Sequence, residues 1–333
     1  MTDRETLVER SAALAGKLGE VILGKPDLVR DVVIGLLAGG HVLLEGLPGL
    51  GKTMMVRALS RLCGLESRRI QFTPDLMPLD ITGSYILTEE GGERRFTFHP
   101  GPVFGNLILA DEINRASPKT QSALLEAMQE RRVTVIGSTH DLPHPFWVMA
   151  TQNPIEMEGT YPLPEAQLDR FLVKLVVGDV PAKVLETLVL ERGRGDLPDL
   201  DPLMTKQDIV AAMEAVESME ISRPIASYVA RLVRATHPSE GDPAAKPIRY
   251  GASPRAALAI GMAARARAFL EGRATVGFED VKAVAPHALR HRIILDYAAR
   301  LDGVTADGVV AALLSSVEEL ERRPPAIISE KRA

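Results

Sequence analysis

The sequence predicts an α/β fold built on a parallel sheet, followed by a helical domain. Short continuous apolar runs, such as Leu107-Ile108-Leu109-Ala110, alternate with helical patterns up to Val180-Pro181. Such runs are typical of strands that are buried on both faces of a parallel sheet. A glycine-rich segment, Gly46–Thr53, separates the first apolar run from a helical pattern. Beyond Pro181 the alternation stops, and residues 182–333 show helical periodicity only, so a second domain is expected there.

The composition is that of a globular protein and argues against a nucleic-acid-binding one. The chain has 333 residues, 46% of them hydrophobic and 25% charged, which is ordinary for a globular protein. The net charge of −5 argues against an extended nucleic-acid-binding face, so no nucleic acid is expected as a partner. We expect an α/β core over residues 1–190, a linker rich in Gly, Asp and Pro over 191–204, and a helical domain over 205–333.

Cysteine content and terminal sequence bear on location. Cys63 is the only cysteine, so an intrachain disulfide cannot form and a reducing compartment is indicated. The first residues lack the basic and apolar regions of a signal peptide. The longest apolar run, near Val32 to Leu44, is too short to span a bilayer. We therefore expect a cytoplasmic protein with no membrane span.

The glycine-rich segment has the spacing G-x-x-x-x-G-K-T of a phosphate-binding loop. Its glycines let backbone N–H groups approach phosphate oxygens, and a following helix would place its N-terminus against them. Lys52 can reach the β- and γ-phosphates, and the Thr53 hydroxyl can ligate Mg²⁺. The expected nucleotide-binding residues are Gly46, Leu47, Pro48, Gly49, Leu50, Gly51, Lys52, Thr53 and Met54.

Polar residues end two later apolar runs. Asp111 and Glu112 follow the run Leu107–Ala110, and Asn153 follows the run Phe146–Ala150. Ligands of parallel sheets bind beyond the carboxyl ends of the strands, where these side chains would meet. Asp111 is expected to hold Mg²⁺ and Glu112 to accept a proton from an attacking water. The Asn153 amide could bind that water and a phosphate oxygen, or serve as a turn former before a proline.

Two arginines, Arg170 and Arg255, are candidate functional residues because of their positions in the sequence. Arg170 precedes the last apolar run of the α/β part and could pair with Asp169 or Glu165, or reach the nucleotide of a neighbouring subunit. Arg255 falls in the first turn of a helix capped by Ser253, where the helix dipole disfavours a cation by ~0.3–1 kcal/mol. A nearby phosphate would explain the cation, and so would full hydration. We expect Arg255 to close the helical domain over the nucleotide.

Two hairpins are expected as insertions in the α/β part. Residues 84–88 and 95–98 alternate in polarity on either side of a Glu89–Gly92 turn, and residues 133–136 turn back through Gly137-Ser138. The first hairpin could contact a substrate or be a surface loop. Phe96 and Phe98 could engage a partner protein or pack inside the hairpin.

Together these residues resemble the MoxR family of AAA+ ATPases, and the resemblance covers most of the chain. It implies that Lys52 and Thr53 belong to Walker A and Asp111-Glu112 to Walker B. It also implies that Asn153 is sensor 1, Arg170 the arginine finger and Arg255 sensor 2. The motifs that carry it are Gly46–Thr53, Pro74–Gly83, Leu109–Ala116, Gln121–Met128, Ala150–Pro154, Glu165–Phe171 and Ser253–Arg255.

The resemblance further implies a P-loop AAA+ core with five parallel strands, a helical lid, and ATP and Mg²⁺ as ligands. Members assemble into rings, usually hexamers, and act as chaperone-like remodellers. Their partners commonly carry a von Willebrand factor A domain, and some members help to mature metalloenzymes. No residue here identifies the client protein.

Two other functions use the same loop. A small-molecule kinase is disfavoured by the helical C-terminal part with Arg255, and assays with and without acceptors would separate it from an ATPase. A nucleotide switch that binds without turnover is disfavoured because Glu112 beside Asp111 supplies a built-in base. No Asn-Lys-x-Asp motif is present, so ATP is preferred to GTP.

Overall fold

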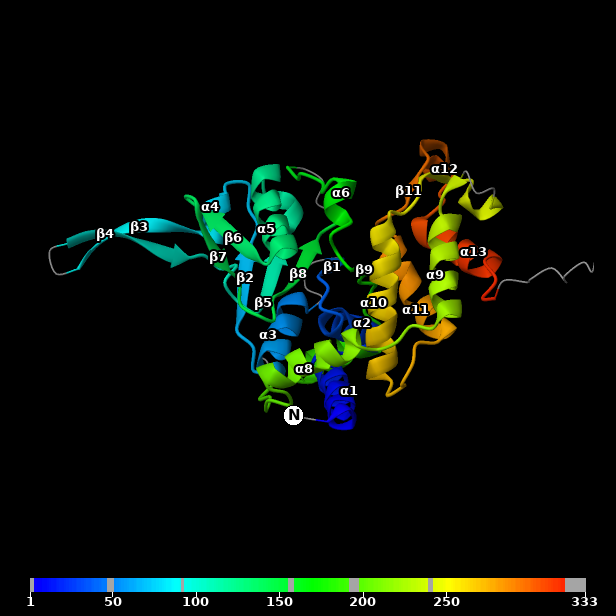
Figure 1. Cartoon of the computed structure of the whole chain (residues 1–333), viewed down its shortest axis with the longest axis horizontal. Helices are drawn as coiled ribbons and strands as arrows, with labels where there is room; N and C mark the ends of the chain where they lie inside the picture. Colours follow the sequence, from blue (N-terminus) through cyan, green and yellow to red (C-terminus); the bar gives the residue numbers. More distant parts are fainter. Residues whose placement is uncertain are drawn as a thin grey trace, which may run out of the picture.

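The predicted arrangement of a parallel α/β core beside a helical domain is confirmed by a computed structural model, which describes residues 3–46, 51–90, 93–154, 159–191, 198–238 and 242–320. Figure 1 shows the sheet and its helices on one side, the helical domain on the other, and a long hairpin that projects from the sheet side. Among the described residues, no helix combines the length and apolar character needed to cross a membrane.

The central sheet has five strands in the order β2-β5-β8-β1-β9, and every neighbouring pair is parallel. Glu45 aligns with Gln152, and Gln71 aligns with Asp111. The carboxyl ends of the strands therefore lie along one edge and their amino ends along the other. The strands are β1 (Val42–Glu45), β2 (Ser67–Gln71), β5 (Leu107–Asp111), β8 (Trp147–Gln152) and β9 (Val173–Val176).

Alternate strand residues pack into two hydrophobic clusters, one on each face of the sheet. In β5, Leu107 and Leu109 join the first cluster, and Ile108 and Ala110 join the second. The helices of the first face are α1 (Arg4–Val21), α2 (Pro26–Leu37) and α3 (Lys52–Cys63), and that of the second face is α5 (Pro118–Glu130). Burial on both faces explains why the inner strands β1, β5 and β8 have nearly continuous apolar sequences, unlike the edge strand β2.

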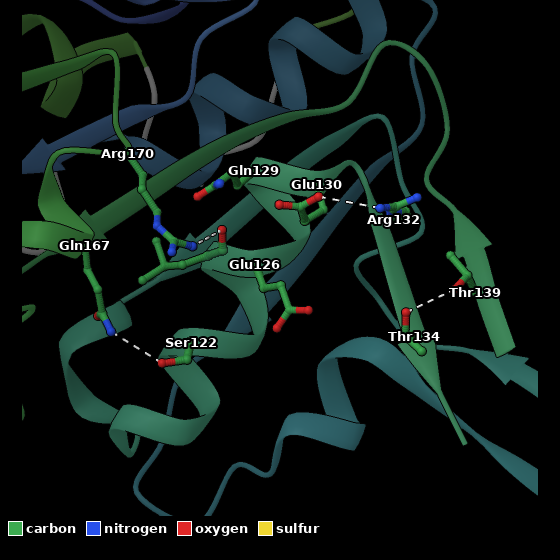
Figure 2. A pocket seen from close by; sticks show the side chains of 10 residues that line it. Ser122, Glu126, Gln129, Glu130, Arg132, Thr134, Thr139, Gln167 and Arg170 are labelled. Atoms are coloured by element: carbon green, nitrogen blue, oxygen red, sulfur yellow. Dashed lines mark hydrogen bonds and ion pairs between the residues drawn. The ribbon is translucent and has the colours of Figure 1, made fainter. Parts of the chain in front are cut away.

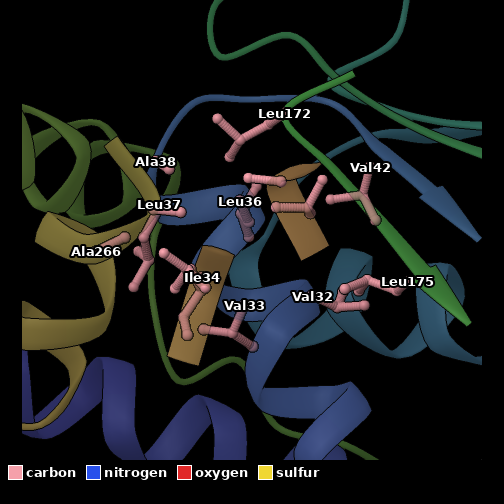
Figure 3. Close-up of a cluster of buried hydrophobic side chains, with 14 of the residues drawn as sticks. Val32, Val33, Ile34, Leu36, Leu37, Ala38, Val42, Leu172, Leu175 and Ala266 are labelled. Atoms are coloured by element: carbon pink, nitrogen blue, oxygen red, sulfur yellow. The ribbon is translucent and has the colours of Figure 1, made fainter. Parts of the chain in front are cut away.

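Helix α2 is buried on nearly all sides, because it packs against both the sheet and the helical domain (Figure 3). Its residues Val32–Leu37 are all buried. They lie among Leu172 and Leu175 from the segment that forms β9, and Ala266 from the helical domain. A helix that is apolar all round is expected in such an interior position. One hydrophobic cluster consequently runs from the sheet into the helical domain.

The helical domain begins its helices where the sequence predicts. Thr205 caps α8, and Ser253 caps α10. A two-stranded sheet of β10 (Ile248–Tyr250) and β11 (Ile294–Leu295) is also present, which the helical periodicity did not predict. Helix α7 (Ala182–Glu191) precedes this domain, whose helices are α8 (Lys206–Glu217), α9 (Arg223–Ala235), α10 (Pro254–Leu270), α11 (Phe278–Leu289), α12 (Tyr297–Leu301) and α13 (Ala306–Ser316).

The helical domain expected to begin at residue 205 is not separated in space from the α/β part. Helix α8 packs against α1 and α2 of the α/β part, and Arg10 Nη1 lies 2.8 Å from Asp208 Oδ2. Residues 192–197 of the expected linker lie outside the described residues. The division into a core and a helical domain therefore stays a prediction at the level of its boundaries.

Both hairpins are present. The long one joins β3 (Gly83–Glu90) to β4 (Glu93–Pro100), and the short one joins β6 (Arg132–Val135) to β7 (Ser138–Asp141). Residues 91–92 of the predicted turn lie outside the described residues. Short helices precede the long hairpin (α4, Pro78–Thr82) and β9 (α6, Glu165–Leu168).

The two phenylalanines of the long hairpin differ in their surroundings. Phe98 pairs with Tyr85 across the strands and stacks on His140 of the short hairpin, with ring centroids 3.8 Å apart. Phe96 lies opposite Leu87, farther out, and the two residues are 73% and 51% exposed. Phe98 thus holds the two hairpins together, whereas Phe96 and Leu87 form an exposed apolar pair.

We expect Phe98→Ala to loosen the base of the long hairpin and Phe96→Ala to leave it intact. Phe98→Ala should lower the local stability of the hairpin by about 1–3 kcal/mol. This is less than the cost for a fully buried phenylalanine, because Phe98 is only half-buried. Hydrogen exchange of the β3 and β4 backbone amides measures the local effect. Equal exchange rates in the two variants would contradict this difference.

Candidate functional site

The first and last parts of the glycine-rich loop lie where the sequence predicts, between β1 and α3. The Gly46 N–H donates to the Gln152 carbonyl at 3.2 Å, and a Cβ on Gly46 would lie 2.7 Å from the Val177 Cβ, so only glycine fits. Gly51 has φ +80° and caps α3 without a side-chain hydrogen bond. The first N–H groups of α3 therefore lack a side-chain cap. Leu47, Pro48, Gly49 and Leu50 lie outside the described residues.

Lys52 connects the loop to the acidic pair. Its Nζ donates to the Gly46 carbonyl at 2.6 Å. Partial burial lowers the pKa of Lys52, and the nearby carboxylates of Asp111 and Glu112 act in the opposite direction. The structure therefore brings together the lysine and the two carboxylates that the sequence placed more than fifty residues apart. Thr53 and Met54 follow on the first turn of α3, both half-buried.

A buried threonine fixes the acidic pair. The Thr151 hydroxyl, fully buried in β8, donates to Asp111 Oδ1 at 2.7 Å and accepts from the Glu112 backbone N–H at 2.8 Å. Both bonds join β8 to the end of β5. Asn153 lies two residues after Thr151, at the same edge of the sheet, and is 7% exposed. Sequence reasoning missed Thr151, although a polar residue in an otherwise apolar strand was the available signal.

Glu112 is held in place by two donors that sequence reasoning also missed. Its Oε2 accepts from Gln71 Nε2 at 3.1 Å and from Arg115 Nη1 at 2.9 Å. Its backbone has φ +57°, in the left-handed region that non-glycine residues seldom adopt. Gln71 ends β2, the strand beside β5, so its signal was a polar residue at a strand end. This arrangement orients the Glu112 carboxylate without direct contact to Lys52.

Asp111 has a cationic neighbour as well. Arg69 of β2 places Nη2 2.7 Å from Asp111 Oδ2, and its side chain is 52% exposed. The described part of the chain contains no group of three or more His, Cys, Asp or Glu residues that could hold a metal ion. A Mg²⁺ ion bound by Thr53 and Asp111 would therefore depend on phosphate oxygens and water for its other ligands, which is the usual mode for this ion.

Arg170 lies at the opposite edge of the sheet. The Leu172 N–H donates to the His41 carbonyl at 2.8 Å, so the segment that carries Arg170 meets the amino end of β1, whereas the loop follows its carboxyl end. Four residues of strand separate the two edges by ~13 Å. The sequence motif is present, but this chain does not bring Arg170 to its own Lys52.

Within the described residues, Arg170 makes neither of the two local ion pairs that the sequence suggested, with Asp169 or with Glu165. Its Nη1 donates to the Leu125 carbonyl of α5 at 2.8 Å. Its side chain borders a cavity of about 600 Å³ between α5 and the short hairpin (Figure 2). Glu126, Gln129, Glu130 and Gln167 also line this cavity. The guanidinium thus sits at the edge of a polar recess.

Arg255 lies with Arg170 rather than with the loop. Its Nη1 is 3.7 Å from Asp169 Oδ2, and the same carboxylate accepts from the Ser253 hydroxyl at 2.9 Å. The countercharge for this cation is therefore the carboxylate next to Arg170, and the Arg255 side chain is half exposed. In this structure Arg255 therefore lies beside Asp169 and not beside Lys52, and its closure of the helical domain over a nucleotide stays a prediction.

Comparisons with known proteins give matches over both the α/β part and the helical part of the chain. The family model "ATPase family associated with various cellular activities (AAA)" matches residues 41–173, and "AAA lid domain" matches residues 244–313. The uncharacterized protein YeaC of Bacillus subtilis is 46% identical over 305 residues, which cover 90% of this chain and 92% of YeaC. Chaperone MoxR1 of Mycobacterium tuberculosis is 44% identical over 300 residues, covering 89% of this chain and 79% of MoxR1.

A solved structure is also similar over nearly the whole chain. It is a crystal structure of a protein from Cytophaga hutchinsonii, with a TM-score of 0.87 and 40% sequence identity. The match covers 95% of this chain and 96% of that one. The similarity therefore extends over the sheet, the hairpins and the helical domain together.

Thr151→Val should lower the free energy of unfolding by about 1–3 kcal/mol, although the two side chains have nearly the same shape. The substitution leaves the Glu112 N–H without its partner and removes the donor to Asp111. Urea denaturation measures the change. Thr134→Val is the matched control, because Thr134 is exposed and bonds only to the Thr139 hydroxyl. Equal stability of the two variants would contradict the role given to Thr151.

Proposed function

The chain belongs to the MoxR family of AAA+ ATPases, and from this membership we propose that it hydrolyses ATP with Mg²⁺ in a ring of identical subunits. One observation carries the proposal. Lys52 and the Asp111-Glu112 pair lie at one edge of the sheet, and Arg170 and Arg255 lie at the other. Each chain thus carries both halves of a phosphate site, but at opposite edges of its sheet. A complete site then forms where one edge of a chain meets the other edge of a neighbouring copy.

In this proposal the loop and the start of α3 bind the phosphates. The first N–H groups of α3 and the Lys52 ammonium supply donors and positive charge. Thr53 and Asp111 hold Mg²⁺, which when bound neutralises charge that develops on the phosphate oxygens. Arg69, whose half-exposed side chain now contacts Asp111, has to release it for that purpose. Because the Arg69 guanidinium stays in contact with water, this ion pair is weaker than a fully buried one and can exchange its partner.

Glu112 is the proposed general base. It accepts a proton from the attacking water while the bond between the γ-phosphorus and the bridging oxygen breaks. In this structure Gln71 and Arg115 hold the carboxylate, so its activity depends on how these contacts rearrange. Asn153, at the same edge, is proposed to help to orient the water. These roles need only residues that lie at the carboxyl ends of β2, β5 and β8.

The arginines are proposed to act on a neighbouring subunit. Arg170 is at the far edge of its own sheet from Lys52, and it borders an open polar cavity. Arg255 lies beside it through Asp169. A ring in which this edge meets the loop edge of the next chain would bring both cations to the γ-phosphate. The hexameric size of the ring rests on the family alone.

We also propose that hydrolysis remodels a protein partner. The support is the relative described as a chaperone and the exposed pair of Leu87 and Phe96 on the projecting hairpin. The partner class suggested by the family is a protein with a von Willebrand factor A domain, acting on a client. The Phe96→Ala chain, compared with the unaltered chain for stimulation by a candidate partner, tests whether this pair is the contact.

Glu112→Gln should bind Mg·ATP and hydrolyse it about 10²–10⁴-fold more slowly, because the amide cannot accept the proton of the water. Lys52→Ala should instead lose affinity for the nucleotide, because its ammonium is part of the phosphate site. Equilibrium binding of a fluorescent ATP analogue and steady-state phosphate release separate the two effects. Wild-type turnover by Glu112→Gln, or unchanged affinity of Lys52→Ala, would remove the residue from its proposed role.

Arg170→Ala should retain ATP binding and lose turnover by ~10³–10⁵-fold, the usual contribution of an arginine supplied to phosphoryl transfer. A mixture of Arg170→Ala and Glu112→Gln chains should recover activity, since an intact Glu112 in one chain then meets an intact Arg170 from the other. Turnover per subunit should also rise steeply with protein concentration. Constant turnover down to concentrations where only monomer is present would contradict action on a neighbour.

A further inference from the structure

One buried arginine of the helical domain binds the segment that carries Arg170. Arg292 follows α11, and its side chain is 3% exposed. Its Nε donates to Asp169 Oδ1 at 2.7 Å, and its Nη2 donates to the carbonyls of Asp169 and Phe171 at 3.1 and 2.6 Å. Asp169 and Phe171 are the two residues on either side of Arg170.

The remaining donors of Arg292 are also satisfied. Its Nη1 donates to the Leu172 carbonyl at 3.0 Å and to the Ala288 carbonyl of α11 at 2.5 Å. A guanidinium has five N–H donors in a rigid planar fork, and all five have acceptors here. Four of the five bonds go to residues 169–172, so one side chain fixes the backbone on both sides of Arg170.

Neighbouring residues of the same segment make parallel contacts. His291 Nε2 lies 3.2 Å from the Phe171 carbonyl, and Arg290 Nη1 donates to the Lys174 carbonyl at 3.2 Å. The consecutive residues 290–292 therefore bind the chain from Asp169 into β9. On its other side, Arg170 donates to the Leu125 carbonyl of α5. Arg170 is held between α5 of the core and the end of α11 of the helical domain.

We propose that Arg292 is a positioning residue that ties the orientation of Arg170 to the position of the helical domain. Through Asp169, which also faces Arg255, it links the two arginines to the same carboxylate. A displacement of the helical domain in one subunit then moves both cations relative to the nucleotide of its neighbour. This inference rests on the proposed action of Arg170 across a subunit border, and it adds the element that controls that action.

The test uses full-length chains in the mixture of Arg170→Ala and Glu112→Gln. In that mixture only the Glu112→Gln chain supplies an Arg170, and only the Arg170→Ala chain supplies a working Glu112. Arg292→Lys removes the fork but keeps the charge. Placed in the Glu112→Gln chain, it should lower the recovered phosphate release by about 10–100-fold, because small misplacements of a catalytic group have effects of this size. Placed in the Arg170→Ala chain, it should leave the recovered activity unchanged.

A loss that appears only when Arg292→Lys is in the Glu112→Gln chain indicates a positioning role. If Arg292→Lys merely destabilised the fold, it would lower the recovered activity in either chain. Arg267→Lys is the matched control, because Arg267 binds the buried Asp280 within the helical domain. In either chain it should leave the recovery unchanged. Asp169→Asn, which keeps the backbone carbonyls, should reproduce the one-sided loss if Arg292→Lys does not fold.

The outcomes separate this inference from the function on which it rests. If the parent mixture recovers no activity, the action of Arg170 on a neighbour is wrong, and this inference falls with it. If the parent mixture recovers activity and Arg292→Lys lowers it equally in both chains, or in neither, only the positioning role is wrong. A loss confined to the chain that supplies Arg170 supports it.

Discussion

Parallel strand pairing is the constraint on which the rest of the structure depends. Because all five strands run the same way, each has its carboxyl end at one edge and its amino end at the other. A residue directly after one strand and a residue directly before another therefore lie at opposite edges of the sheet within a single chain. The loop, Asp111, Glu112 and Asn153 follow strands, whereas Arg170 precedes one. The direction of the strands thus places the residues proposed for phosphate chemistry at two opposite edges before any side chain is considered.

The ion pairs of the two edges differ in the energy needed to break them. At the carboxyl edge, Arg69 and Arg115 are 52% and 43% exposed, and their partners Asp111 and Glu112 are 16% and 20% exposed. Because the two guanidinium groups stay in contact with water, these pairs are weaker than a pair whose two partners are both buried. At the amino edge, Arg292 and Asp169 are 3% and 15% exposed, and removing one partner of a buried pair costs ~3–5 kcal/mol. The carboxyl edge can therefore exchange partners, while the amino edge stays together.

Much of the fold and the members of the site could be predicted from the sequence, because local signals determine them. Burial on both faces makes β5 and β8 continuous apolar runs, and Ser253-Pro254 marks the start of α10. The position of Arg255 could not be predicted, since it depends on how α10 packs against the core. Thr151 and Gln71 had only a weak signal, a polar residue within a strand or at its end, and Arg292 had none, because the partners of all three lie in other elements.

The hydrophobic cluster around α2 has a consequence for how the molecule comes apart. Val32–Leu37 lie against both the β9 segment and α10, so neither part has a complete apolar interior without the other. We therefore expect the two regions to unfold together, and a fragment cut at the linker to expose the shared apolar surface to water. The two regions are distinct in sequence and in the families that match them, but they share one apolar interior.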